Sequence, residues 1–240
     1  MGTIFNASAW ETVWRFRGTF INGLLNTLKS AGFGLLIAIV IGFALGLMAT
    51  SGKKALRRIA RVYVEFFQNT PLILQVCFLF YAFAYSGIRL AVTTVGFVGL
   101  GLYHGAYVSE VVRAGIESIP FGQFDAARSQ GFAYIDTMRL VVLPQTIKII
   151  LPPMVNQVVA LIKNTSCLYI IGGADLIAST YNFVTGSTTS NAYGPGYFVG
   201  AALFFVVCFP LSFLAGRWER RLKERDRVNV QQPEKTEVTA

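Results

Sequence analysis

Charged residues are scarce in this sequence. Asp, Glu, Lys and Arg make up only 14% of its 240 residues, whereas 54% are hydrophobic. An ordinary soluble domain carries about 25% charged residues. The charge is also one-sided, with 21 Lys and Arg against 12 Asp and Glu, and it is clustered between long apolar runs. This composition predicts an integral membrane protein and argues against a nucleic-acid-binding protein.

Residues that bind metals or act as nucleophiles are scarce as well. The chain has one histidine, His104, and three cysteines that lie in apolar runs, Cys77, Cys167 and Cys208. Their spacing gives neither a metal-ligand set nor a disulfide framework. The sequence also lacks a phosphate-binding Gly-Lys-Ser/Thr loop. We therefore expect no metal, no cofactor and no enzymatic activity, and we expect His104 to be a hydrogen-bonded packing residue.

Five apolar runs are long enough to cross a bilayer. They cover about residues 21–49, 62–85, 92–116, 149–171 and 195–215, and about 20 helical residues span a hydrocarbon core of about 30 Å. Because lipid offers the backbone no hydrogen bonds, these runs are predicted to be helices. The predicted fold class is all-α and integral to the membrane, with one transmembrane domain at 21–220. Small residues in the first run have the spacing of close helix packing (Gly32, Gly34, Gly42 and Gly46).

The segments outside these runs are more polar. Residues 1–20 carry Trp, Phe and Arg and are expected to form an interfacial amphipathic segment, with a disordered leader as the alternative. No cleavable signal peptide is evident, so the first run is expected to act as an uncleaved signal. Residues 173–194 are expected to form an exposed loop with a short helix. Residues 221–240 are expected to form a basic, partly disordered tail.

The distribution of Lys and Arg among the connections predicts the orientation of the chain. Most positive charge lies after the first run, in residues 119–144 and in the C-terminal tail. Five spans with the N-terminus outside and the C-terminus in the cytoplasm place all three basic regions inside. The same topology places residues 119–144 in the cytoplasm.

The stretch 119–144 is the sizeable polar interruption between the third and fourth runs. Pro120 breaks a helix that runs in from upstream, and Asp125 opens a helical pattern. Gly131 is expected to allow either a close approach or a bend between two short helices, and Pro144 marks the start of the next long segment. This helix-turn-helix is predicted to be a surface knob that fits a socket on a partner protein. An ordinary interfacial helix between two spans is the alternative.

Polar residues in or near the runs mark a candidate substrate path. Glu110 and Lys163 would each cost about 2.5–3.5 kcal/mol at the middle of a span, so they need partners or water. They are expected to face each other across the third and fourth spans, either as an ion pair that orients two helices or as the walls of a cavity for a zwitterion. Alternatively, Glu110 lies at a helix end. The remaining candidates, of which the group before Pro71 is favoured as a helix cap, are Asn164, Thr165, Gln68, Asn69 and Thr70.

Several stretches together resemble the permeases of ABC importers, in the polar amino acid branch that includes the histidine and glutamine permeases. The resemblance covers about residues 20–220. An EAA-like run has an acidic residue, two alanines, a glycine and Leu-Pro on matching positions, namely Asp125, Ala126, Ala127, Gly131, Leu143 and Pro144. Further matches are Asn69-Thr70-Pro71-Leu72 with Gln75, Ala106-Tyr107 with Glu110, Arg113-Ala114-Gly115-Ile116, and Leu161 to Ser166. The family usually has Glu at position 125, often Ile at 141, and usually Arg or a similar residue at 68, where this chain has Asp, Val and Gln.

The resemblance implies a five-span type I permease with a cytoplasmic coupling helix, which carries a polar amino acid by alternating access. A separate pair of ABC ATPase subunits would bind the ATP and contact Asp125, Ala126, Ala127, Arg128, Gly131 and Pro144. The other implied partners are a second permease copy or a sister permease, an extracytoplasmic amino-acid-binding protein and membrane lipids. The implied location is the bacterial plasma (inner) membrane, as a multi-pass protein.

Two other functions fit the same residues. A stand-alone ion- or proton-coupled carrier or channel would use Glu110 and Lys163 and would work without ATP. A structural subunit with no role in the pore would tolerate neutral substitutions at both positions.

Overall fold

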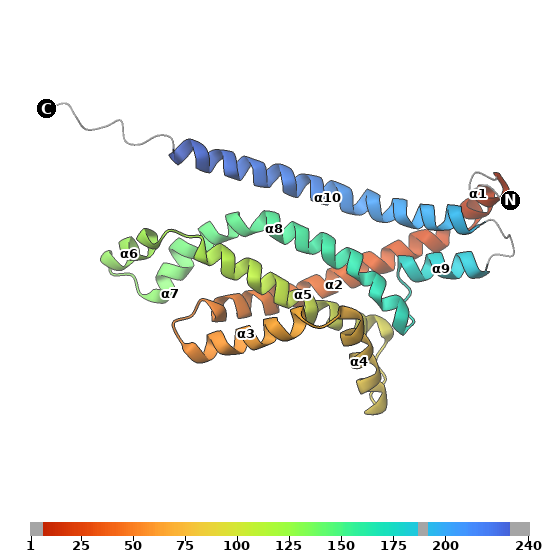
Figure 1. Ribbon diagram of the computed structural model, residues 1–240, viewed down its shortest axis with the longest axis horizontal. Coiled ribbons are helices and arrows are strands. Elements are labelled where there is room, and N and C mark those ends of the chain that lie inside the picture. The colour runs from red at the N-terminus through yellow and green to blue at the C-terminus, as the bar shows by residue number, and fades with distance from the viewer. Residues whose placement is uncertain (1–6, 187–191, 231–240) are drawn as a thin grey trace.

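The computed structural model describes residues 7–186 and 192–230, and the regular elements in this part of the chain are helices. Most of the long helices run roughly along one axis (Figure 1). Helix α1 (Ala7–Arg15) lies at one end of this axis, which we call the N-terminal end. Helices α6 (Phe121–Ser129) and α7 (Tyr134–Asp136) lie at the other end, which we call the α6–α7 end.

Helices α2 (Arg17–Ala49) and α5 (Val92–Glu117) pack closely at the centre. A Cβ built on Gly46 would lie only 2.6 Å from Cγ1 of Val112, and Gly42 faces Val108 in the same way. Small residues allow two helices this close approach. Close packing is therefore confirmed for Gly34, Gly42 and Gly46, whereas a Cβ at Gly32 would meet nothing within 4 Å.

The second expected span is broken. Helix α3 (Lys54–Gln68) starts earlier than residue 62, and α4 (Leu72–Tyr85) follows at an angle of 99°. Pro71 lies at the break in an extended conformation, with φ −63° and ψ 130°. Proline has no N–H to donate and disfavours a helical conformation in the residue before it. The break between α3 and α4 therefore follows from the proline at position 71.

The fourth expected span also begins earlier than predicted. A π-helical turn, η1 (Thr137–Val142), leads into α8 (Leu143–Asn164), and a 3-10 segment, η2 (Thr165–Ile171), follows. Pro144 lies in the first turn of α8, where a missing N–H costs little. Pro152 and Pro153 lie inside α8.

The N-terminal end is formed by α1 (Ala7–Arg15), α9 (Leu176–Gly186) and the start of α10 (Tyr193–Val230) (Figure 1). Helix α1 buries Ala9 and Val13, while Trp14 stays 70% exposed. Residues 7–15 thus form an amphipathic helix, and its position at the membrane interface stays a prediction; residues 1–6 lie outside the described part.

Two expectations about the connections need correction. Residues 173–194 contain the expected short helix, but this helix is packed rather than exposed, because Leu176, Phe183 and Val184 join Phe20 in a buried cluster. Residues 187–191 lie outside the described part. The expected tail begins as helix, since α10 continues to Val230, and residues 231–240 are not described.

Within the described residues, three helical stretches are long and apolar enough to cross a membrane, namely Arg17–Ala49, Tyr134–Ile171 and Tyr193–Leu222. The bent pair α3–α4 counts as a fourth if its two helices form one span. Helix α5 corresponds to the remaining expected span. Its 26 residues measure about 39 Å, which is long enough to cross. Its glycines, His104 and charged residues lower its hydropathy, and thirteen of its residues are buried among the other helices.

Candidate functional site

The turn after α6 has the geometry of a Schellman motif. The N–H of Phe132 donates to the carbonyl of Ala127 over 3.1 Å, and the N–H of Gly131 donates to the carbonyl of Arg128 over 2.9 Å. Gly131 has φ 81°, a left-handed conformation that favours glycine. The predicted bend at Gly131 is confirmed. Helix α6 begins at Phe121, directly after Pro120, so the predicted start at Asp125 was one turn late.

The α6–α7 region is fixed to the bundle by a few buried side chains and is otherwise exposed. Ala127 is 4% exposed, and Phe124 packs on the core that contains Ile119, Met138 and Val142. Asp125, Ala126 and Arg128 are exposed on α6. The region also exposes several large apolar side chains, namely Phe121, Tyr134, Ile135 and Leu140. This combination is typical of a rigid docking surface.

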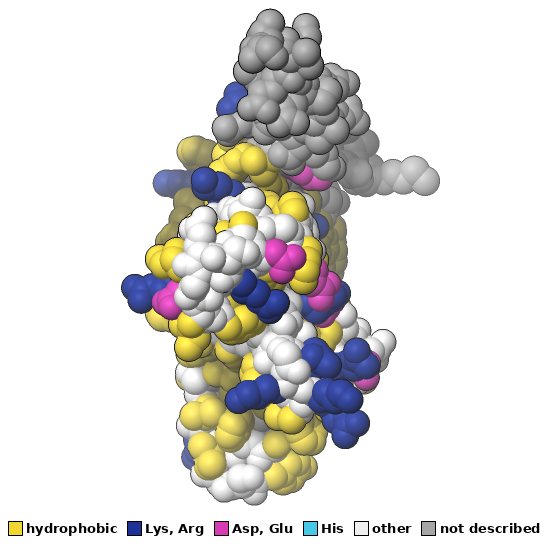
Figure 2. Space-filling model, turned by 90° about the vertical axis from the view of Figure 1, so that its left-hand side faces the viewer, with side chains coloured by type: hydrophobic (Ala, Val, Ile, Leu, Met, Phe, Trp, Pro, Cys, Tyr) yellow, Lys and Arg dark blue, Asp and Glu magenta, His cyan; other side chains and the backbone are white. Residues whose placement is uncertain are grey.

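A hydrogen bond between α8 and α6 and a hollow beside α6 and α7 are further features of this surface. The amide of Gln145 in α8 donates to Oε1 of Gln123 in α6 over 3.3 Å and to the carbonyl of Val141 over 2.9 Å. The hollow beside α6 and α7 has a volume of about 590 Å³ and is lined by residues such as Thr50, Ile116, Phe121, Tyr134 and Met138. Figure 2 looks at this end and shows apolar and basic side chains close together.

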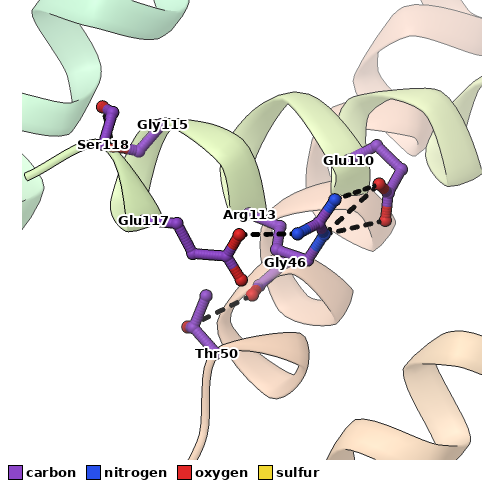
Figure 3. A network of polar contacts seen from close by, with 7 residues as sticks. All are labelled: Gly46, Thr50, Glu110, Arg113, Gly115, Glu117 and Ser118. Carbon is purple, nitrogen blue, oxygen red and sulfur yellow. Dashed lines mark hydrogen bonds and ion pairs between the residues drawn. The ribbon is translucent and has the colours of Figure 1, made fainter.

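Arg113 bridges two glutamates on α5 (Figure 3). Its Nη2 lies 2.7 Å from Oε2 of Glu110, and its Nε donates to Oε1 of Glu110 over 3.1 Å. Its Nη1 lies 2.6 Å from Oε2 of Glu117. The spacings i,i+3 and i,i+4 place all three side chains on one face of the helix.

These three charges line a cavity of about 490 Å³ between α3 and α5. Arg57, Arg61, Glu65 and Gln68 of α3 line the opposite side. The cavity wall therefore carries three arginines and three glutamates, and Gln68 is the one substrate-path candidate that shares it with Glu110. A wall with equal numbers of both signs suits a zwitterion, whose ammonium and carboxylate each need an opposite charge.

The group before Pro71 caps α3, as favoured from the sequence. The amide of Asn69 donates to the carbonyl of Glu65 over 2.7 Å, and the hydroxyl of Thr70 donates to the carbonyl of Phe66 over 2.8 Å. Gln75 of α4 reaches back across the break, where its Nε2 donates to the carbonyls of Phe67 and Thr70, each over 3.1 Å. These bonds satisfy carbonyls that the end of a helix leaves free.

The expected pairing of Glu110 with Lys163 is wrong. Glu110 is held by Arg113, and Lys163 is exposed in the last turn of α8. The two helices run in opposite directions, because α5 leads into α6 and α8 leads away from η1. Glu110 lies seven residues from the α6–α7 end of α5, and Lys163 lies at the far end of α8, which is about 33 Å long.

Asn164 and Thr165, next to Lys163, have structural contacts. The amide nitrogen of Asn164 lies 3.1 Å from Nε2 of His104. Thr165 is fully buried, and its hydroxyl donates to the carbonyl of Ile162 over 2.8 Å. These residues are separated from the Glu110 cavity, since none of them lines it.

The structure adds site residues that the sequence analysis missed. Arg113 and Glu117 complete the charged face of α5, and Arg57 and Arg61 face them from α3. The spacing Glu110, Arg113, Glu117 was a usable signal, because it matches an ion-pair ladder on one helix face. The proximity of Arg57 and Arg61 follows from tertiary packing and had no local signal.

Comparison with known proteins identifies the family. The family described as "Binding-protein-dependent transport system inner membrane component" matches residues 34–224. The chain belongs to this family. It is therefore a membrane permease component of the ABC-transporter type, as the EAA-like run indicated.

Two curated relatives cover most of the chain. The "Probable glutamine ABC transporter permease protein GlnM" of Bacillus subtilis (strain 168) is 35% identical over 205 residues, which are 85% of this chain and 94% of that protein. The "Glutamate transport system permease protein GluD" of Corynebacterium glutamicum is 34% identical over 230 residues, which are 94% of this chain and 81% of that protein.

Solved structures share the fold. A chain from the "Crystal structure of an amino acid ABC transporter with histidines" superposes with a TM-score of 0.77 at 33% identity, covering 87% of this chain and 96% of that chain. The inward-facing MetNI methionine ABC transporter gives 0.72 at 17% identity, covering 86% of this chain and 97% of that chain. These comparisons confirm the all-α type I importer fold and favour the importer permease over a stand-alone carrier or channel.

Proposed function

We propose that this chain is the permease subunit of an ATP-driven importer of polar amino acids, and that a separate ATPase drives it through residues 119–144. The observation that carries the proposal is the form of the α6–α7 region. It is a surface of fixed shape, stiffened by the Schellman turn at Gly131 and exposed at Asp125, Ala126 and Arg128. A rigid projection of this kind can transmit the movement of a docked partner to the helices behind it.

Buried contacts connect the α6–α7 region to α5, so a movement of this region can be transmitted to that helix. Ile119, Met138 and Val142 pack in one cluster with Val112 and Ile116 of α5. A displacement of the region would therefore shift α5, which carries Glu110, Arg113 and Glu117. Packed cores respond to such shifts as units, because they deform little. Helix α5 thus connects the proposed docking surface with the charged cavity, so that movement at the docking surface can change the cavity as alternating access requires.

The cavity between α3 and α5 is the proposed place for the substrate. Its three arginines and three glutamates offer partners for both the carboxylate and the ammonium of an amino acid. The names of the relatives GlnM and GluD, a glutamine and a glutamate permease, agree with a polar amino acid. Lys163, Asn164 and Thr165 line no part of this cavity, and Asn164 and Thr165 are proposed to hold α8 in place through their hydrogen bonds.

The remaining partners follow from this role. ATP binding and hydrolysis are assigned to a cytoplasmic ATPase dimer, since the chain has no phosphate-binding loop. A second permease copy or a sister permease completes the membrane part, and an extracytoplasmic amino-acid-binding protein delivers the substrate. The N-terminus is placed outside and the α6–α7 end in the cytoplasm of a bacterial cell.

Substitution at Ala126 tests the docking surface. Ala126→Arg adds a large exposed side chain to α6 without a change in the buried contacts. We expect loss of ATP-dependent uptake of labelled glutamine, glutamate and histidine in vesicles that hold the assembled transporter. Ala55→Arg is the matched control, because Ala55 is exposed on α3, whose first residues lie towards the same end. Equal uptake by both variants would contradict the proposed docking.

A separate experiment tests the orientation. Arg128 is exposed on α6, so Arg128→Cys should react with a membrane-impermeant thiol reagent in inside-out vesicles. The same reagent should leave intact cells unlabelled at this position. Labelling from outside intact cells would place the α6–α7 end on the wrong side of the membrane.

A further inference from the structure

A second hollow lies between α8 and α10, apart from the substrate cavity. It has a volume of about 620 Å³ and shares no lining residue with the cavity at Arg113. Its apolar wall is formed by Val155 of α8 and by four residues of α10, Leu211, Leu214, Ala215 and Leu222. Leu214 is 60% exposed, so the wall is open towards the outside of the bundle. We call this hollow the α8–α10 groove.

Cations and an indole ring line one part of the groove. Arg217, Trp218 and Arg221 belong to its lining, and none of the described side chains that line it is a carboxylate. Arg217 and Arg221 are four residues apart and so lie on the same face of α10. The guanidinium of Arg217 also lies over the ring of Phe213, one turn earlier on α10 and outside the lining, 4.7 Å from the ring centroid.

Helix α8 carries a further cation, Lys148, which lies outside the lining of the groove. Lys148 is exposed and precedes Val155 by seven residues, or about two helical turns, so both lie on nearly the same face of α8. Since α8 and α10 run in opposite directions, moving from Val155 towards Lys148 on α8 corresponds to moving from Leu211 towards Arg221 on α10. The positive charge therefore gathers at the part of the groove nearer the α6–α7 end.

We propose that the α8–α10 groove binds an anionic phospholipid from the surrounding membrane. One acyl chain lies along Val155, Leu211 and Leu214, and the phosphate is bound by Arg217 and Arg221. Arginine suits this task because its planar guanidinium donates two parallel hydrogen bonds to phosphate oxygens. Trp218 lies where the apolar wall meets the charges, and tryptophan is enriched at the boundary between lipid and water. Basic hollows between transmembrane helices are a known form of site for anionic head groups.

A second copy of the chain fits the groove less well. In a two-fold symmetric contact the same surface faces itself. Such an interface would gather the Arg217 and Arg221 side chains of both copies in one patch, and the described side chains of the lining include no carboxylate to compensate them. A lipid phosphate supplies the missing negative charge.

The test compares lipid binding by variants of the purified full-length permease. Arg217→Gln with Arg221→Gln removes both phosphate ligands. Arg220→Gln removes the same kind of charge from an exposed position on α10 that does not line the groove. Retention of phosphatidylglycerol and phosphatidylcholine is measured by native mass spectrometry after exchange in mixed micelles, with circular dichroism as a check of folding.

The expected result is a clear preference of the wild-type chain for phosphatidylglycerol. The double variant should bind it about 30-fold more weakly, since each basic residue near the membrane surface contributes about a fivefold effect. Arg220→Gln should keep most of the binding. Leu214→Trp, which fills the groove without a change in charge, should weaken binding of both lipids.

Any one of four results would overturn the proposal. The first is that the double variant binds phosphatidylglycerol as tightly as the wild type does. The second is that the wild type binds phosphatidylcholine as tightly as phosphatidylglycerol. The third is that Leu214→Trp has no effect on lipid binding. A disulfide that forms between two copies carrying Leu214→Cys in native membranes would assign the groove to a second permease instead. None of these readouts depends on uptake, so they are independent of the proposed transport function.

Discussion

The amide nitrogen of Asn164 lies 3.1 Å from Nε2 of His104, and this contact joins the last turn of α8 to the middle of α5. His104 is 2% exposed and is packed against the rings of Tyr103 and Tyr107. The hydrogen-bonded packing role expected for this histidine is confirmed. The contact therefore fixes how two central helices lie relative to each other.

Loss of this contact should weaken the bundle. Asn164→Leu leaves the ring nitrogen of His104 without its partner, and we expect a loss of about 1 kcal/mol in stability, the usual range for a hydrogen bond between transmembrane helices. Thermal unfolding of the purified protein measures the effect. His104→Phe and the double variant complete a double-mutant cycle. Strictly additive effects would show that the contact contributes nothing.

The conformation of Gly131 leads to a second prediction. At φ 81°, Gly131→Ala should cost about 1–2 kcal/mol locally, because a Cβ clashes with the backbone in the left-handed region. Gly131→Asn should cost less, since asparagine adopts this conformation more readily. We expect uptake to fall more for Ala than for Asn. Gly122→Ala is the control, because Gly122 lies in α6 and a Cβ there meets nothing within 4 Å. Equal uptake by Gly131→Ala and the wild type would show that the turn is not needed.

The local structure of residues 119–144 was predicted from the sequence more accurately than the contacts of the substrate-path candidates were. Gly131 and Pro120 act through their own backbone, so a local pattern was enough to predict the bend and the break. The pairing of Glu110 with Lys163 failed because it needed knowledge of how two helices align. Arg113, by contrast, is three residues from Glu110 on the same helix. Two side chains at this spacing are neighbours in any helix, so their contact does not depend on the tertiary arrangement.

Other differences have similar causes. Residues 173–194 were expected to be exposed because they are polar, yet the backbone at residues 174 and 176 is hydrogen-bonded to polar side chains of α2. The hydroxyl of Thr27 in α2 accepts a hydrogen bond from the N–H of Leu176 over 3.0 Å, and Asn26 donates to the carbonyl of Ala174 over 3.0 Å. The break at Pro71 was visible in the sequence, but the angle of 99° is set by how α4 packs on α5.

The bridging position of Arg113 leads to a third prediction. Arg113→Met would leave Glu110 and Glu117 without their cation and change the cavity wall from balanced to net negative. We expect a strong loss of uptake and a raised KM for substrate, while Arg113→Lys keeps part of the activity because it keeps the charge. Uptake kinetics and ATPase co-purification measure the two effects separately, and co-purification should be unchanged. Normal uptake by Arg113→Met would remove this cavity from the substrate path.

A fourth prediction concerns pH and Asp175, which lies in the connection before α9. Its carboxylate accepts hydrogen bonds from the N–H groups of Ile177 and Ala178 over 3.1 and 3.3 Å. Burial raises the pKa of Asp175 above its ordinary value of 3.8, and these two bonds oppose the rise. The folded state therefore holds the proton more tightly than the unfolded state. This contribution to stability is present below the ordinary pKa and is lost as the pH rises through the raised one.

Asp175→Asn should remove this dependence, because the amide stays neutral and its oxygen still accepts from the start of the helix. We expect the variant to gain stability relative to the wild type as the pH rises from about 4 to about 7. Thermal unfolding across this range measures the difference. Parallel curves for the two proteins would contradict the direction assigned to this pKa.

The most direct test of the account is a photo-crosslinking experiment in cells that express the whole transporter. A photoreactive amino acid replaces Arg128, which is exposed on α6, or Ala55, which is exposed on α3 and serves as the control. The account predicts a crosslink from position 128 to an ATP-binding subunit, identified by mass spectrometry, and none or far less from position 55. A crosslink of equal yield from both positions, or one from position 55 alone, would contradict the assignment of the α6–α7 region as the site where the ATPase docks.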